Sequence, residues 1–256
     1  MSAMYDPPGY LGILTLVGAI GIPTLTCVVL YRGARRADLG RGRAALLGGA
    51  AVVVLGGWLA ASATIAGAGS YHTELGKQPP WLPIAAVAAL IALLTASRLP
   101  AVARALSSAG TPSRLLLPHT FRVAGLAFLI TMGLGHLPAL FALPAGLGDI
   151  AVGVAAPFVA RRLARGTGHR RAVWFNVLGI VDLVVALGLG GLTAFQVIHV
   201  TPVNDAISQL PLVLIPTTAV PLLLTLHIVS LRQLAGASRA PRPAASPAEA
   251  LGLNGT

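Results

Sequence analysis

Long apolar runs alternate with short polar connections along most of the chain. Each run approaches the length of about 20 residues that an α-helix needs to cross the hydrocarbon core of a bilayer. The pattern predicts seven spans, at about 11–31, 44–67, 81–98, 121–137, 145–160, 173–198 and 210–231. We therefore predict an all-α polytopic membrane protein, folded as a seven-transmembrane-helix bundle. The apolar patch Leu115–Pro118 is expected on the membrane surface, and the turn Leu137–Pro144 is expected to dip into the bilayer as a re-entrant piece.

The distribution of arginine predicts the orientation of this bundle. Arginines cluster at 32–43, 98–122, 161–171 and beyond 231, whereas the other connections carry Lys77 as their basic residue. Because basic loops face the cytoplasm, we predict an N-terminus outside, a cytoplasmic C-terminus and a multi-pass location in the inner (plasma) membrane. Residues 1–232 are predicted to form a single transmembrane domain. Residues 233–256 are rich in Ala, Pro and Ser, which predicts a disordered cytoplasmic tail.

Composition narrows the class of protein and of partner. The chain is 55% hydrophobic and 10% charged, whereas a soluble domain carries about 25% charged residues. The net charge of +11 would suit nucleic acid, but the arginines lie between apolar runs, so membrane lipids are the expected partners and nucleic acid is not. Cys27 is the single cysteine; it permits no internal disulfide and no zinc or iron–sulfur site, and neither a metal nor a cofactor is predicted.

Two carboxylates fall inside predicted spans. Asp149 follows Pro144, Gly146 and Gly148 in a stretch expected to be loosened or broken as a helix, and Asp182 lies in the next span. Counted from the neighbouring arginines, the two residues lie roughly 18 Å and roughly 16 Å from the inner face, which places both near the midplane. Charges at this depth are costly and by default indicate a functional site.

The chemistry of such a pair remains open between two interpretations. If the aspartates share a low-dielectric site, they would not both be ionised at neutral pH, and at least one would carry a proton. That arrangement suits a proton or cation site, with His136 at the outer end of span four lining an outward cavity above Asp149. In the other interpretation, each aspartate stays protonated and only fixes helix packing.

A second group of polar residues is predicted nearer the inner face. Asn176 on span six and His227 on span seven lie at similar depth, so they are expected to hydrogen-bond across helices and hold them together. Arg122 is placed at the inner edge of span four. We expect its guanidinium to reach the lipid headgroups, or otherwise to point inward toward Asn176 and His227.

The segments around 121–125, 137–149 and 178–184 resemble a group of uncharacterised bacterial multi-pass membrane proteins, a resemblance that implies membrane insertion but no activity. Retinal proteins also have seven spans, but they need a lysine in the last span, and span seven has none. Bis-histidine haem ligation needs two level histidines. His136 and His227 are predicted at opposite ends of the bundle, so they would not share a haem.

Three hypotheses from different classes follow from the sequence. The first is a small transporter or a proton/cation-coupled ligand-binding protein that uses Asp149 and Asp182. The second is an intramembrane enzyme acting on a lipid or isoprenoid, similar in architecture to membrane terpene cyclases. The third is a structural or sensory membrane protein whose polar residues only specify packing.

Overall fold

The computed structural model describes residues 7–72 and 79–239, and over these ranges the chain is helical with no strand. The long helices are α1 (Gly9–Arg36), α2 (Arg41–Gly67), α3 (Trp81–Ala96), α7 (Ala139–Ala164), α8 (His169–Ala194) and α9 (Val220–Arg239). Shorter elements are α4 (Pro100–Ser107), α5 (Thr111–Arg114), the 3₁₀ helix η1 (Leu117–Gly125), α6 (Leu126–Gly133), the 3₁₀ turn η2 (Ala206–Ser208) and the π-helical turn η3 (Ile215–Ala219).

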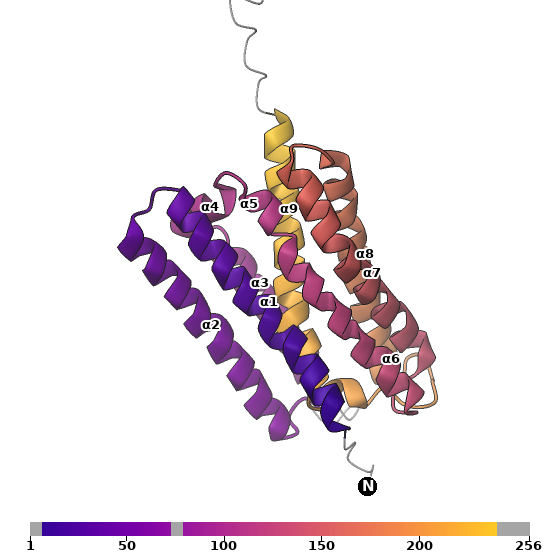
Figure 1. Ribbon diagram of the computed structural model, residues 1–256. Coiled ribbons are helices and arrows are strands. Elements are labelled where there is room, and N and C mark those ends of the chain that lie inside the picture. Colours follow the sequence, from indigo (N-terminus) through magenta and orange to yellow (C-terminus); the bar gives the residue numbers. More distant parts are fainter. Residues whose placement is uncertain (1–6, 73–78, 240–256) are drawn as a thin grey trace, which may run out of the picture.

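Within these ranges, 6 helical segments are long and apolar enough to cross a membrane, or 7 if the pair α3 and α4, bent by 80°, forms one span. Figure 1 shows them running side by side as a bundle. This agrees with the predicted all-α membrane bundle. The side of the membrane that each end faces stays a prediction.

The turns that join α1 to α2 and α7 to α8 lie at one end of the bundle, which we call the arginine-rich end (Figure 1). The α1–α2 turn is flanked by Arg35, Arg36 and Arg41, and the α7–α8 turn by Arg162 and Arg170. The start of α1, the α6–α7 turn and the connection from α8 to α9 lie at the opposite end.

The fourth and fifth spans begin earlier than the hydrophobic pattern predicted. One apolar segment, Thr111–Gly133, contains α5, η1 and α6, so Leu115–Pro118 lies inside a span and not on the membrane surface. Leu115 and Leu116 are fully buried. Helix α7 begins at Ala139 and continues past Pro144, so the re-entrant turn predicted at 137–144 is wrong. The last helix extends to Arg239, and residues 240–256 of the predicted tail lie outside the described residues.

Helix α9 and the turn η3 lie at the centre of the bundle, whereas α2 lies at its edge. The share of buried residues is 67% in the most apolar window of Ile215–Gly236, but 11% in that of Arg41–Gly67. The central helix packs against α1, α3 and α8. Since lipid surrounds a peripheral helix, the exposed valines of α2 are those that a bilayer covers.

A proline removes one backbone hydrogen bond from this central segment, and a tryptophan side chain replaces it. Pro221 has no backbone N–H, so the carbonyl of Thr217, four residues earlier, loses its helical donor. The indole nitrogen of Trp58 on α2 donates to that carbonyl at 2.8 Å, and the hydroxyl of Ser62 donates to Thr217 Oγ1 at 2.7 Å. An unpaired carbonyl inside a membrane is costly, so these bonds fasten α2 to the break.

Candidate functional site

An arginine at the centre of the bundle holds both predicted carboxylates. Arg122 lies in the middle of Thr111–Gly133 and is 2% exposed. Its Nε donates to Asp149 Oδ1 at 2.7 Å, and its Nη2 donates to Asp182 Oδ2. Its third nitrogen, Nη1, lies 3.4 Å from His227 Nε2. These hydrogen bonds are charge-assisted, and the planar guanidinium fixes the relative positions of three helices.

The expectation that Arg122 reaches the headgroups is therefore wrong. The predicted span started at residue 121, which put Arg122 at the membrane edge. The actual segment starts at Thr111, so the same residue lies at mid-depth. The other stated orientation, inward toward His227, is the one that the structure has.

Glycines create the space in which this cluster forms. A Cβ atom at Gly125 would overlap the side chain of Asp149, and one at Gly148 would overlap the carboxylate of Asp182. Helix α7 is continuous through this stretch. The glycines around Asp149 therefore allow neighbouring helices to approach closely, and they do not break the helix as the sequence suggested.

His227 also connects the cluster to polar residues nearer the arginine-rich end. Its Nδ1 lies 2.9 Å from Asn176 Oδ1, so the predicted hydrogen bond across helices is present. Asn176 Nδ2 donates to Ser230 Oγ at 3.0 Å and to the carbonyl of Ala172 at 2.7 Å. Because the amide nitrogen already donates twice, the amide oxygen is the acceptor. This network assigns the imidazole proton to Nδ1 and leaves Nε2 to accept from Arg122.

A second buried histidine was missed by the sequence reasoning. The ring of His119 stacks on that of His227 at 3.9 Å and meets Phe175 edge-on at 5.7 Å. His119 is fully buried, and neither ring nitrogen has a hydrogen-bond partner in the part of the chain that the structure describes. The available signal was its place next to Leu115–Pro118, a patch that the sequence interpretation placed outside the spans.

The formal charges of the cluster do not balance. Arg122 contributes one positive charge, whereas Asp149 and Asp182 contribute two negative charges when both are ionised. A buried charge without compensation is strongly unfavourable. The cluster is neutral when it holds one additional positive charge, supplied either by a proton or by a bound cation.

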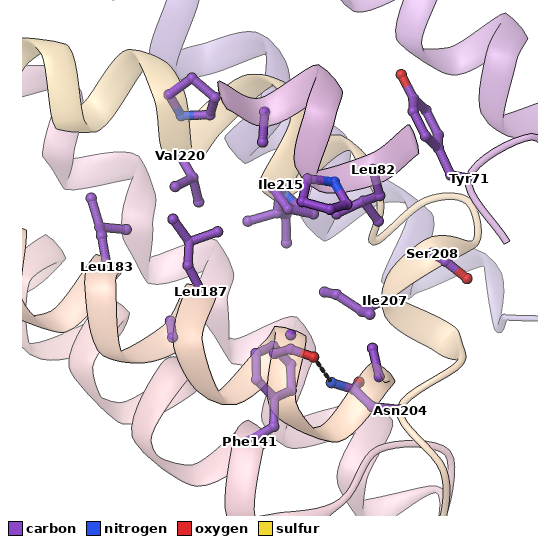
Figure 2. Close-up of a pocket in the computed structure, with 18 of the residues that line it drawn as sticks. Tyr71, Leu82, Phe141, Leu183, Leu187, Asn204, Ile207, Ser208, Ile215 and Val220 are labelled. Atoms are coloured by element: carbon purple, nitrogen blue, oxygen red, sulfur yellow. Dashed lines mark hydrogen bonds between the residues drawn. The ribbon is translucent and has the colours of Figure 1, made fainter. Parts of the chain in front are cut away.

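A cavity of about 260 Å³ extends from this cluster toward the opposite end of the bundle. Its wall is mostly apolar, and Figure 2 shows Leu187, Ile207 and Ile215 around the same space. Asp149 is part of this wall, and Asp205 is a second acidic residue on it. No arginine, lysine or histidine belongs to the wall that the described residues form.

The remaining predicted residue, His136, is not part of the cavity wall. It is exposed in the turn between α6 and α7. The polar groups on the wall are instead Tyr71, Asn204, Ser208 and the two aspartates. Asn204 is held by hydrogen bonds from its Nδ2 to Thr193 Oγ1 at 2.8 Å and to the Gly190 carbonyl at 3.4 Å.

Comparisons with known proteins give one match. A family model described as a domain of unknown function (DUF8737) matches residues 79–235. No curated protein and no solved structure matches the chain. The matched range contains the whole charged cluster but neither α1 nor α2.

Proposed function

We propose that this chain, which belongs to the DUF8737 family, is a small plasma-membrane transporter that exchanges protons for a cationic, largely apolar solute. Its N-terminus would lie outside and its C-terminus in the cytoplasm, as the arginine clusters predict. The cavity beside Asp149 would then open toward the outside. The Asp149–Arg122–Asp182 cluster would be the coupling site.

The observation that carries this proposal is the double role of Asp149. The residue forms part of the cavity wall, and its Oδ1 accepts a hydrogen bond from Arg122 Nε at 2.7 Å. A cation that enters the cavity therefore reaches a carboxylate that Arg122 already binds. Since the same guanidinium binds Asp182, a change in the charge of one carboxylate alters the electrostatic interactions of the other.

The charge balance supports exchange as the mode of coupling. The cluster needs one positive charge beyond Arg122, and a proton and a monovalent cation satisfy that need equally. Holding both would leave an excess positive charge in a low-dielectric site. Binding of the cation therefore favours release of the proton, which is the thermodynamic requirement for exchange.

The composition of the cavity supports the class of solute. An apolar wall stabilises an apolar body by burial, and acidic residues without a basic one favour a positive charge over a negative one. A quaternary ammonium ion with an aromatic arm has this chemistry. A volume of about 260 Å³ suits a small solute.

The other two hypotheses have less support. A terpene-cyclase-like enzyme needs a carboxylic acid that donates a proton to an olefin, whereas Asp149 accepts its bond from a guanidinium. A purely structural role would explain the ion pairs, but it gives no reason for a carboxylate of the cluster to line a cavity.

The test uses the purified full chain in detergent and benzyltrimethylammonium as the ligand. Calorimetry measures binding, and a pH indicator in weakly buffered solution measures proton release. We expect saturable binding with release of up to about one proton per cation bound. Asp149→Asn is expected to abolish both signals.

Asp38→Asn is the matched control. Asp38 is exposed in the α1–α2 turn with a φ of 52°, a conformation that asparagine also adopts readily, so this variant should bind like the wild type. Binding without proton release would refute coupling. Equal binding by the Asp149→Asn variant would refute the site. No binding by the wild type, together with a lower melting temperature of the Asp149→Asn variant, would favour the structural role.

A further inference from the structure

A second hollow lies on the lipid-facing side of the bundle, in a groove of about 1110 Å³ between α7 and α8. Its floor carries small and aliphatic side chains, among them Ala151 and Ala155, and Leu178 stands on its α8 wall. The groove runs from Asp182 at mid-depth to the α7–α8 turn. It is separate from the cavity that the proposed solute would enter.

The end of the groove at the turn is strongly basic. Arg162 comes from the end of α7, and Arg170 and Arg171 come from the start of α8. No acidic residue shares this end of the groove in the ranges that the structure describes. Trp174, one helical turn deeper and 53% exposed, has the side-chain type that settles at the headgroup level of a bilayer.

The length of the groove matches one leaflet. Helix α8 rises roughly 16 Å between Arg171 and Asp182, and half of a hydrocarbon core is about 15 Å thick. A phosphate among the arginines would therefore place an acyl chain along Leu178 and Ala155, with its end near the midplane. The other arginine-rich turn, between α1 and α2, supplies basic residues but lines neither this groove nor the cavity beside Asp149.

We propose that the α7–α8 groove is a binding site for one anionic phospholipid of the leaflet at the arginine-rich end. The phosphate is bound by Arg162, Arg170 and Arg171, and one acyl chain lies along the apolar floor. The charge of the three arginines selects an anionic headgroup over a zwitterionic one. This site does not depend on the proposed exchange function.

The experiment measures quenching of tryptophan fluorescence by brominated lipids in vesicles that contain the full chain. Dibrominated phosphatidylglycerol is compared with dibrominated phosphatidylcholine, and Trp174→Phe identifies the signal from the groove. The wild type should prefer phosphatidylglycerol at Trp174. Replacing Arg162, Arg170 and Arg171 together with Gln should weaken that preference by at least about tenfold, since each arginine near a membrane surface contributes about fivefold.

Two controls separate a built site from general surface charge. The triple replacement of Arg32, Arg35 and Arg36 with Gln removes the same charge from the α1–α2 turn, and all three are exposed; it should leave the preference unchanged. Ala151→Leu fills the groove and should reduce quenching, whereas Ala60→Leu on the exposed face of α2 should not.

The proposal would be overturned by equal loss of preference in both arginine variants, by no preference in the wild type, or by unchanged quenching in the Ala151→Leu variant. Circular dichroism of each variant confirms that helical content is retained. A partner helix in place of the lipid would appear as a cross-linked oligomer without headgroup preference, which also overturns it.

Discussion

Replacement of Arg122 by Leu tests whether the charged cluster is integral to the bundle. The variant loses the bonds to Asp149, Asp182 and His227 and leaves two carboxylates close together without a cation. Removing one partner of a buried ion pair typically costs about 3–5 kcal/mol. At about 2–4 °C per kcal/mol for a chain of this size, the midpoint of thermal unfolding should fall by about 10 °C.

The assay is thermal unfolding in detergent followed by circular dichroism, with Arg104→Leu as the control. Arg104 is exposed on α4, and its replacement should change stability by less than about 0.5 kcal/mol. The triple variant Arg122→Leu, Asp149→Asn and Asp182→Asn removes all three charges together. It should recover most of the lost stability, because a neutral set carries no uncompensated charge.

Two results would refute this reasoning. If Arg122→Leu melts within about 2 °C of the wild type, the cluster contributes less than about 1 kcal/mol and does not hold the helices. If the triple variant melts no higher than the single variant, the loss arises from the missing side-chain volume and not from the unbalanced carboxylates.

Three further predictions concern packing and orientation. Gly148→Ala should destabilise the protein by about 1–3 kcal/mol, because the new methyl group overlaps the carboxylate of Asp182. A Cβ at Gly56 meets open space, so Gly56→Ala should stabilise the protein by up to about 1 kcal/mol. Chemical denaturation measures both changes. Trp58→Phe should cost about 1–3 kcal/mol, since it leaves a carbonyl unpaired. In a cysteine-free background, Thr167→Cys should react with an impermeant maleimide only after cells are opened, and Thr201→Cys should react in intact cells.

Each of these has an outcome that contradicts it. Equal effects of the two alanine substitutions would mean that the helices separate freely at the cluster. The control for Trp58→Phe is Trp174→Phe, because Trp174 is exposed and this variant should melt like the wild type. Equal melting of the two tryptophan variants would contradict the prediction. Labelling of the α7–α8 turn in intact cells would reverse the predicted orientation.

The hydrophobic pattern predicted the class of fold and a similar depth for the two aspartates, because both depend mainly on span length and residue spacing. It did not predict Arg122 as their partner. The error came from a misplaced span boundary. Pro118 and His119 lower the local hydropathy, so the predicted fourth span began only at residue 121. The burial of His119 against His227 and Phe175 is a tertiary contact, and local sequence periodicity does not predict it.

The role of Gly148 was also beyond the sequence. Gly148 beside Asp149 is compatible with a broken helix or with close packing, and only the position of Asp182 on the neighbouring helix decides between them. Likewise, Pro221 leaves the carbonyl of Thr217 without a helical donor, but the donor that binds it, Trp58, is 159 residues away along the chain.

The 3₁₀ geometry of η1 has a mechanical consequence. A 3₁₀ helix rises about 2.0 Å and turns about 120° per residue, against about 1.5 Å and about 100° in an α-helix. Over the 9 residues of Leu117–Gly125, the two forms differ by about 4–5 Å in length and by roughly half a revolution. This stretch carries Arg122 and continues directly into α6. Rewinding this stretch as an α-helix would therefore rotate the guanidinium of Arg122 and shift α6 along its axis in a single movement.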